Sequence, residues 1–340
     1  MTRYKMIVLI LILSLALRLV NLNQSLWLDE AVQAITAQNS FSYIFQEITG
    51  DFHPPLYYFL MHFWVRIFGS SEIVLRMPSV LFGVGAVYIV YKISHLSSLR
   101  NLGYLSALFL ATAPFHIYYS QEARMYSMVT FFSVLSMYFF IKINEFKNYR
   151  HPDLDGGIPF LNHKRKGFLP PNRRARNDNV LYFIFTILMI YSDYYGFLVL
   201  LAQGIYLLLQ KKYKFLILNS LFLTLCYLPW LPMFITQIKT GMAATQILPG
   251  WGKLANVSFI KAIPLTLIKF TIGRITIFNK IIYGLVSLGI LGMLGVLGNN
   301  FYKCYKKESK SFFTIILLWF LVPLVVSWVV SLVIPNFQPF

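Results

Sequence analysis

Residues 6–30 read MIVLILILSLALRLVNLNQSLWLDE, an apolar run that leads into two adjacent carboxylates, Asp29 and Glu30. The apolar part, residues 6–22, approaches the roughly 20 residues that a helix needs to cross a bilayer. Ionised groups are costly near hydrocarbon, so an acidic pair at the mouth of a span indicates a functional site. The run follows two basic residues and has no small-residue cleavage site, so we interpret it as an uncleaved first span.

The composition of the whole chain is that of an integral membrane protein. Apolar residues make up 57% of it and charged residues only 12%, about half of the roughly 25% that is usual in soluble domains. The net charge of +18 could indicate nucleic-acid binding, but basic residues in a membrane protein mark cytoplasmic loops, so we expect no nucleic-acid partner. Cys226 and Cys304 would be separated by the membrane, so no disulfide is expected.

Apolar runs and basic loops together predict an all-α, polytopic transmembrane bundle of nine helices. The predicted spans are residues 6–22, 73–92, 102–117, 124–142, 180–192, 195–210, 215–236, 280–298 and 311–334. Basic residues place the 143–179 loop in the cytoplasm together with Arg3 and Lys5, so an even number of spans must lie between them. This parity excludes 56–68 as a span and predicts that it is a helix on the outer face; the same argument excludes 258–277.

We expect one membrane domain over residues 1–340, with the acidic motif in a first outer loop at 23–72. The 143–179 segment is predicted to be a flexible basic loop, because it has few large apolar residues to bury. A further outer loop is expected at 237–279, with a candidate interfacial helix. Of the chain's 12 acids, those predicted to lie outside are Asp29, Glu30, Glu47, Asp51, Glu72, Glu122 and Asp193.

The acidic pair has a chemical and a structural interpretation. Asp29 could act as a general base that takes a proton from an acceptor hydroxyl or amine, and Glu30 could orient Asp29 or hold a metal. Acids are also favoured in the first turn of a helix, and residues 31–38 have helical character, so both could simply cap that helix. The two interpretations stay open on position alone.

Two further segments carry basic residues beside acids. His53-Pro54-Pro55 would place an imidazole at a helix N-terminus, where a phosphate can bind, or else form a rigid turn with an interfacial histidine. Arg124 could bind phosphate with its planar guanidinium, or form a local ion pair with Glu122. Arg76 is either a substrate ligand or an interfacial anchor.

Asp193 is either a substrate ligand or a residue that shapes the turn at 192–196. Its position between two short predicted spans puts it on the same outer face as the acidic pair, so the sequence leaves both interpretations open.

In their order and spacing, these segments resemble the integral-membrane glycosyltransferases of the C superfamily. The resemblance is greatest to glycosyltransferase family 39, which includes protein O-mannosyltransferases and aminoarabinose transferases of lipid A, and it covers roughly residues 5–235. The matching segments are Leu28-Asp29-Glu30, His53-Pro54-Pro55-Leu56-Tyr57-Tyr58, Arg76-Met77-Pro78-Ser79, Ser120-Gln121-Glu122-Ala123-Arg124-Met125-Tyr126-Ser127 and Tyr194-Tyr195-Gly196.

The resemblance implies a sugar donor on a polyprenyl phosphate, a lipid or protein acceptor and attack with inversion at the anomeric carbon. It implies Asp29 as the catalytic acid position, with Glu30 beside it and Glu122 as a second acidic position. Substrate contacts are expected from His53, Tyr57, Arg76, Arg124 and Asp193. A divalent cation is a candidate cofactor, with Asp29 and Glu122 as the ligands that the sequence offers.

The same resemblance implies a multi-pass protein of the plasma membrane, surrounded by membrane lipid, with its active site on the extracytoplasmic face. Relatives continue with further spans and an Arg-Tyr-Leu-like segment, so we expect this chain to be a short form or a piece of a longer protein. A transporter or flippase for lipid-linked sugars, or a polymerase that joins them, is the alternative. A transporter should carry its polar groups near the middle of the membrane, whereas the acids here fall at one face.

Overall fold

The computed structural model describes residues 3–96, 100–145, 171–247, 288, 289, 292, 295 and 310–333. Every regular element in these ranges is a helix, so the all-α class is confirmed for them. In chain order the helices are α1 (Arg3–Leu19), α2 (Leu28–Gln38), α3 (Phe41–Gly50), α4 (Leu56–Phe68), α5 (Glu72–Ser94), α6 (Arg100–Thr112), α7 (Pro114–Ser120), α8 (Tyr126–Glu145), α9 (Pro171–Ser192), α10 (Gly196–Leu209), α11 (Tyr213–Tyr227), the 3-10 turn η1 (Leu228–Trp230), α12 (Leu231–Ile247) and α16 (Lys310–Val333).

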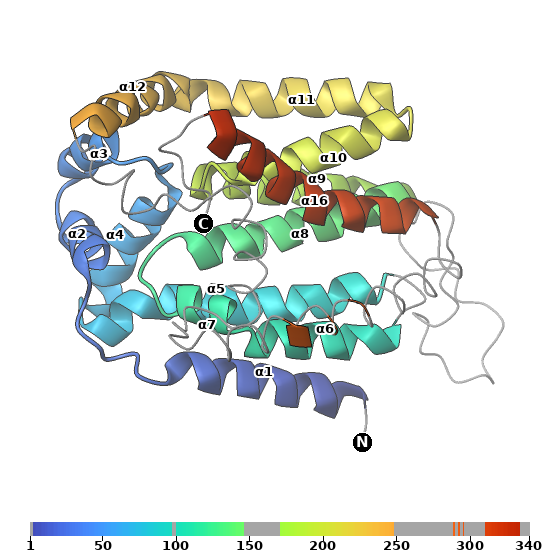
Figure 1. Cartoon of the computed structure of the whole chain (residues 1–340), viewed down its shortest axis with the longest axis horizontal. Coiled ribbons are helices and arrows are strands. Elements are labelled where there is room, and N and C mark those ends of the chain that lie inside the picture. The colour runs from blue at the N-terminus through green and yellow to red at the C-terminus, as the bar shows by residue number, and fades with distance from the viewer. Residues whose placement is uncertain are drawn as a thin grey trace.

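The long helices run along one direction, and α8 packs against both α5 and α9 (Figure 1). Buried apolar side chains from these three helices, among them Leu75, Met137 and Tyr182, belong to the main core. Helix α1 packs on α5 and α6. The short helices α2, α3 and α4 gather with α12 at one end of the bundle (Figure 1), and the candidate site lies among the segments that meet there.

Four described segments are long and apolar enough to cross a membrane, namely Glu72–Ser94, Tyr126–Asn144, Tyr213–Thr240 and Lys310–Val330. Each corresponds to one of the nine predicted spans. Large apolar side chains on their outer faces, such as Leu221 and Leu225, are exposed as lipid-facing residues should be. The protein is therefore a membrane protein, and the other five spans remain predictions. Most of the predicted span at 280–298 lies outside the described residues, as does Cys304.

Two predicted spans are shorter in the structure than the sequence suggested. The run at 102–117 is divided between α6 and α7, because Pro114 has no N–H to continue the first helix and begins the second. Helix α10 has 14 residues, which reach about 21 Å at 1.5 Å each and fall short of the roughly 30 Å hydrocarbon layer. The predicted break between α9 and α10 at residues 192–196 is confirmed.

The boundaries of two predicted loops differ from those observed. Helix α9 begins at Pro171, so residues 171–179 are helical and not part of a flexible loop. Proline is well suited to the first turn of a helix, which explains this early start. Helix α12 extends to Ile247, so the first part of the predicted 237–279 loop is helical too. Residues 146–170 and 248–279 lie outside the described part of the chain.

Helix α4 has the bounds that the sequence predicts for the non-spanning helix at 56–68. It starts after Pro54 and Pro55, and it ends at Gly69, whose φ of 88° is accessible to glycine at little cost. The Trp64 Nε1 atom donates to the Val74 carbonyl at 2.8 Å and ties α4 to the start of α5. The helix is thus fixed at the end of the bundle where α2 and α3 also lie.

Candidate active site

Glu30 is buried in the first turn of α2, with 1% of its surface exposed. It forms two bonds to the Arg76 guanidinium, from Nε to Oε1 at 2.9 Å and from Nη2 to Oε2 at 2.6 Å. Its oxygens also accept from the backbone N–H groups of Ala123 at 2.8 Å and Trp27 at 3.4 Å. The carboxylate therefore joins α2, α5 and the 121–125 turn, and it caps its own helix as the structural interpretation expected.

The other N–H groups of Arg76 donate to backbone carbonyls in the segment that precedes α2. Its Nη1 atom donates to the carbonyls of Leu22 and Gln24 at 2.8 and 2.6 Å, and its Nη2 atom to that of Ser25 at 3.2 Å. A guanidinium has five N–H groups, and each is taken by these carbonyls or by Glu30. This geometry lets both residues position the Asp29 segment, while the catalytic role of Glu30 and the substrate contact of Arg76 stay predictions.

Asp29 lies beside this buried pair but points toward solvent. Its side chain is 40% exposed, and its Oδ2 atom lies 3.9 Å from Nη2 of Arg124, whose side chain is 8% exposed. The Nε atom of Arg124 is buried and has no hydrogen-bond partner. An accessible carboxylate next to a buried cation with an unused donor is an arrangement that can serve two reacting groups at once.

Asp51 is the strongest electrostatic partner of Arg124. Burial alone would lower the pKa of Arg124, but the charge of Asp51, followed by smaller effects of Tyr126, Tyr58 and Asp29, raises it above its ordinary value. The pKa of Asp51 moves the other way. Burial would raise it, yet the nearby His53, the Tyr58 hydroxyl and Arg124 together hold it below its ordinary range. The guanidinium is therefore held firmly cationic.

Hydrogen bonds fix the Asp51 carboxylate at the C-terminal end of α3. Its Oδ1 atom accepts from the Phe52 N–H at 2.7 Å, and its Oδ2 atom accepts from the Tyr58 hydroxyl. Burial, followed by the charge of Asp51, raises the pKa of Tyr58, so this hydroxyl stays a donor. The sequence places Asp51 among the outer acids and Tyr58 in the segment that follows His53, but it does not predict either as a site residue.

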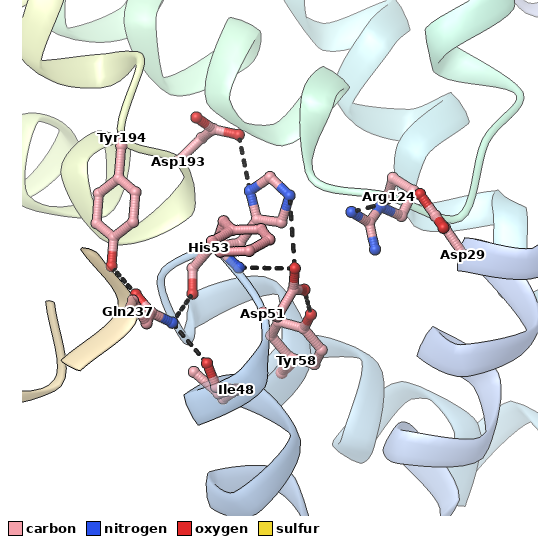
Figure 2. Close-up of polar contacts among 10 residues, drawn as sticks. Asp29, Ile48, Asp51, His53, Tyr58, Arg124, Asp193, Tyr194 and Gln237 are labelled. Atoms are coloured by element: carbon pink, nitrogen blue, oxygen red, sulfur yellow. Dashed lines mark hydrogen bonds and ion pairs between the residues drawn. The ribbon is translucent and has the colours of Figure 1, made fainter. Parts of the chain in front are cut away.

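The imidazole of His53 lies between two carboxylates that come from different parts of the chain (Figure 2). Its Nε2 atom is 3.9 Å from Oδ1 of Asp51, and its Nδ1 atom is 3.5 Å from Oδ2 of Asp193. Both nitrogens therefore face negative charge, which does not favour a phosphate next to them. The predicted contact of His53 with the donor phosphate stays a prediction, and the unused donor of Arg124 makes it the second candidate for that contact.

Asp193 and its turn bring the second half of the chain to the site. Its side chain is 3% exposed. The Oδ1 atom accepts from the Tyr195 N–H at 2.9 Å, as its turn interpretation predicts, while Oδ2 faces His53. The adjacent Tyr194 hydroxyl donates to the side-chain oxygen of Gln237 on α12. Both predicted roles of Asp193 are therefore compatible with its position.

Tyr57 and Glu122 are both buried. Tyr57 is 1% exposed, and its hydroxyl contacts the Ser79 hydroxyl at 3.1 Å, which in turn donates to the Arg124 carbonyl at 3.0 Å. Tyr57 thus supports the 121–125 turn through Ser79, and its predicted contact with substrate stays a prediction. Glu122 lies in that same turn, and its charge acts on both Tyr57 and Tyr126. Its catalytic role remains a prediction.

A metal site cannot be assembled from the described residues alone. They contain no group of three or more histidine, cysteine, aspartate or glutamate side chains that could hold a metal ion. Asp29 and Glu122 stay the candidate ligands for a divalent cation. Such an ion would need further ligands from the substrate, as Mg²⁺ commonly takes from phosphates.

Gln237 lies at the site although no motif in the sequence predicts it there. It is 1% exposed and contacts two segments that the motifs do mark, the 48–53 segment and the 193–195 turn. A single glutamine in an apolar run carries no spacing or charge signal. Only the packing of α12 against α3 brings it to the site.

Comparison with known families agrees with this site. Residues 52–151 match a family model described as dolichyl-phosphate-mannose-protein mannosyltransferase, a match that contains His53, Arg76, Glu122 and Arg124. It confirms the resemblance to the glycosyltransferases of the C superfamily and supports a membrane glycosyltransferase of that type; family 39 in particular remains a prediction. No curated protein matches the chain. Asp29, Asp193 and Gln237 lie outside the matched residues.

Proposed function

We propose that this protein is an inverting glycosyltransferase that moves a sugar from a polyprenyl-phosphate donor to a lipid or protein acceptor at the extracytoplasmic face of the plasma membrane. The family match supports the reaction class. The observation that carries the proposal is the accessible Asp29 carboxylate 3.9 Å from the buried Arg124 guanidinium. The two substrates offer one group to each of these side chains: the acceptor supplies a proton for the carboxylate, and the glycosyl phosphate supplies a phosphate for the cation.

In the proposed reaction, Asp29 takes the proton from the acceptor hydroxyl or amine as the acceptor atom bonds to the anomeric carbon. The bond between that carbon and the phosphate oxygen breaks, and its electron pair leaves with the polyprenyl phosphate. Attack from the face opposite the leaving group inverts the configuration. Arg124 stabilises the charge that develops on the phosphate, because an oriented cation in a partly dry site is more effective than in water.

The remaining site residues would hold these two groups in place. Arg76 and Glu30 fix the start of α2, and hence Asp29. The negative charge of Asp51 favours the cationic form of Arg124. Tyr57 contacts the Ser79 hydroxyl, which donates to the backbone carbonyl of Arg124. Glu122, in the same turn as Arg124, remains the candidate for a second acidic group that orients the acceptor.

A transporter of lipid-linked sugars is the principal alternative. Polar residues in the middle of the described bundle are neutral and bonded to one another, as in the pair Tyr182 and Gln203 at 2.9 Å. The carboxylates and cations described above lie instead at the end where α2, α3, α4 and α12 gather (Figure 1). This distribution supports an enzyme over a transporter, which should bind its cargo near mid-membrane. A polymerase remains compatible with the site, because it differs only in its acceptor.

The substitution Asp29→Asn tests the proposal, because it keeps the shape of the side chain but removes the base. Loss of a general base typically costs about 10²–10⁴ in rate, so transfer should fall by that order while donor affinity stays within a few fold. Glu72→Gln is the matched control, since Glu72 also lies exposed in the first turn of a helix, α5. Transfer at the wild-type rate by Asp29→Asn would contradict the proposal and leave Glu122 as the next candidate. A variant that fails to insert would favour the capping interpretation.

The location of the site is tested separately by labelling. In a background without Cys226 and Cys304, single cysteines at Ser40 and Asn162 should react with an impermeant thiol reagent from opposite sides of the membrane. The distribution of lysine and arginine requires this result. Labelling of both positions from the same side would rule out the nine-span topology and the extracytoplasmic site.

A further inference from the structure

The side-chain amide of Gln237 joins three segments of the chain that are distant in sequence. Its Nε2 atom donates to the Ile48 carbonyl at 2.6 Å and to the His53 carbonyl at 3.1 Å, while its Oε1 atom accepts from the Tyr194 hydroxyl (Figure 2). The Tyr194 hydroxyl is held in turn by Nε1 of Trp230 at 3.1 Å. A glutamine amide has two N–H donors and an oxygen acceptor, and all of them are used.

These bonds select one orientation of the amide. Both carbonyls can only accept, so the amide nitrogen must face them and the oxygen must face the hydroxyl. A leucine would remove the amide donor from both carbonyls. The Ile48 carbonyl, in the last turn of α3, would keep only the Asp51 N–H at 3.3 Å. Gln237 therefore determines how the 48–53 segment lies against the 193–195 turn.

The backbone at His53 is also restricted on its other side. Pro54 follows it, and a residue before proline is confined to extended conformations. Because its carbonyl is also bonded to Gln237, the backbone of His53 is held in place. The imidazole can then move by rotation of the side chain. That side chain lies between Asp51 on its own segment and Asp193 on the α9–α10 turn. Beyond Asp51 lie the Tyr58 hydroxyl and the charge of Arg124.

Two buried atoms at this contact lack a hydrogen-bond partner, namely Nδ1 of His53 and Oδ2 of Asp193. They lie 3.5 Å apart, so each is the nearest polar atom available to the other. Catalytic hydrogen bonds are often long in a protein without substrate and shorten when it binds. A small displacement of the 48–53 segment would separate the two atoms.

We propose that Gln237 is a positioning residue that holds the His53 imidazole between Asp193 and Asp51. The negative charge of Asp51 in turn favours the cationic form of Arg124, so a residue outside the family-matched segment would contribute to the site for transfer. The effect on transfer rests on the proposed function, whereas the placement of His53 does not depend on it.

The first test is the accessibility of His53 in the intact protein. Diethyl pyrocarbonate acylates imidazole nitrogens, and mass spectrometry gives its rate at each histidine. Gln237→Leu should raise the rate at His53 several-fold and leave that at His95 unchanged. Gln203→Leu is the matched control, because Gln203 is also a buried glutamine whose amide nitrogen and oxygen are both hydrogen-bonded, but it belongs to a separate network. An unchanged rate at His53 in a folded Gln237→Leu protein would overturn the proposal.

Tyr194→Phe provides the same test with less disturbance, because it removes only the hydroxyl that holds the Gln237 oxygen. It should raise the His53 rate by a smaller factor, and no increase at all would count against the proposal. If Gln237→Leu does not fold, this variant decides the question. The labelling result holds even if the protein transfers no sugar, so it distinguishes failure of this inference from failure of the proposed function.

The second test is a double-mutant cycle on sugar transfer. Gln237→Leu should lower transfer roughly tenfold, which is within the range of coupled residues in one network. In a His53→Gln background the same change should have little further effect, because the side chain through which Gln237 acts is gone. The control Gln203→Leu should have the same effect in both backgrounds. Additive losses for Gln237 and His53 would show that Gln237 acts by another route.

Discussion

Two polar regions of the molecule differ in how many of their buried polar atoms form hydrogen bonds. Near the middle of the bundle, hydrogen bonds of 2.7–3.1 Å link neutral side chains of α8, α9, α10 and α11. The residues involved are Ser136, Tyr182, Thr186, Gln203 and Asn219. One acceptor of this set, Oδ1 of Asn219, is buried without a partner.

At the end of the bundle, titratable side chains keep buried donor and acceptor atoms that form no hydrogen bond. Nε of Arg124, Nδ1 of His53 and Oδ2 of Asp193 are buried and have no hydrogen-bond partner. A buried charged group without a hydrogen-bond partner costs more free energy than a buried neutral acceptor without one. The comparison indicates that the middle network stabilises the bundle, whereas the end retains groups that a substrate can complete.

The largest effect on stability is expected at the buried pair of Glu30 and Arg76, in which every guanidinium N–H is bonded. Removal of one partner leaves a buried uncompensated charge, which typically costs 3–5 kcal/mol, so Arg76→Gln should lower the unfolding free energy by about that amount. Chemical unfolding in detergent measures it, with Arg66→Gln, on the exposed side of α4, as the control. A loss below about 1 kcal/mol, as for a surface pair, would contradict the structural role assigned to Arg76.

A smaller effect, on binding rather than stability, is expected at Arg124. Hydrogen bonds to a charged group contribute about 1.5–3 kcal/mol, so Arg124→Gln should weaken binding of a polyprenyl-phosphate sugar about 10–100-fold. Arg124→Lys should recover part of the loss, because lysine keeps the charge but not the planar fork. Equal donor affinity in wild type and Arg124→Gln would exclude Arg124 as the phosphate ligand.

In the network near the middle of the bundle, a substitution should lower stability and leave donor binding nearly unchanged. Gln203→Leu removes the acceptor of the buried Tyr182 hydroxyl and the amide donor to Ser136, so it should cost about 1–3 kcal/mol of unfolding free energy. Asn219 still donates to the Tyr182 oxygen, and Thr186 still contacts the Ser136 hydroxyl. Once the protein is folded, donor binding and transfer should remain within a few fold of wild type. A large loss of donor affinity would mean that the middle of the bundle contacts the substrate, as the transporter alternative requires.

The smallest effect concerns pH. The pKa of Asp51 is depressed in the folded protein, so its ionisation contributes stability above the unfolded-state pKa that is lost as pH falls through the folded-state value. The difference in unfolding free energy between wild type and Asp51→Asn should therefore shrink as pH falls from about 5 to about 3. Thermal unfolding in detergent over that range measures it. A difference that grows toward low pH would have the wrong sign for this account.

Local signals predicted the fold well where helices have clear ends. Proline and glycine mark both ends of α4, and the break before Gly196 separates α9 from α10. The prediction failed where a polar segment continues a helix, as at residues 171–179 of α9, because charge does not by itself end a helix. It failed again at Pro114, which divides an apolar run that hydropathy treats as continuous.

The site was predictable only in part. The motifs marked His53, Arg124 and Asp193, which the structure brings to one end of the bundle, and Asp29 beside them. They could not distinguish Arg124, which keeps an unused donor, from Arg76, whose donors are all bonded, because that depends on backbone carbonyls of another segment. Gln237 depends on packing alone.

The position of the donor phosphate tests the central claim most directly. A density map of the protein with a bound polyprenyl-phosphate sugar would show where the phosphate lies relative to the two polar regions. This account predicts that the phosphate contacts the Arg124 guanidinium and that the anomeric carbon faces Asp29. A phosphate beside Tyr182 and Gln203, or a sugar that lies away from Asp29, would contradict it.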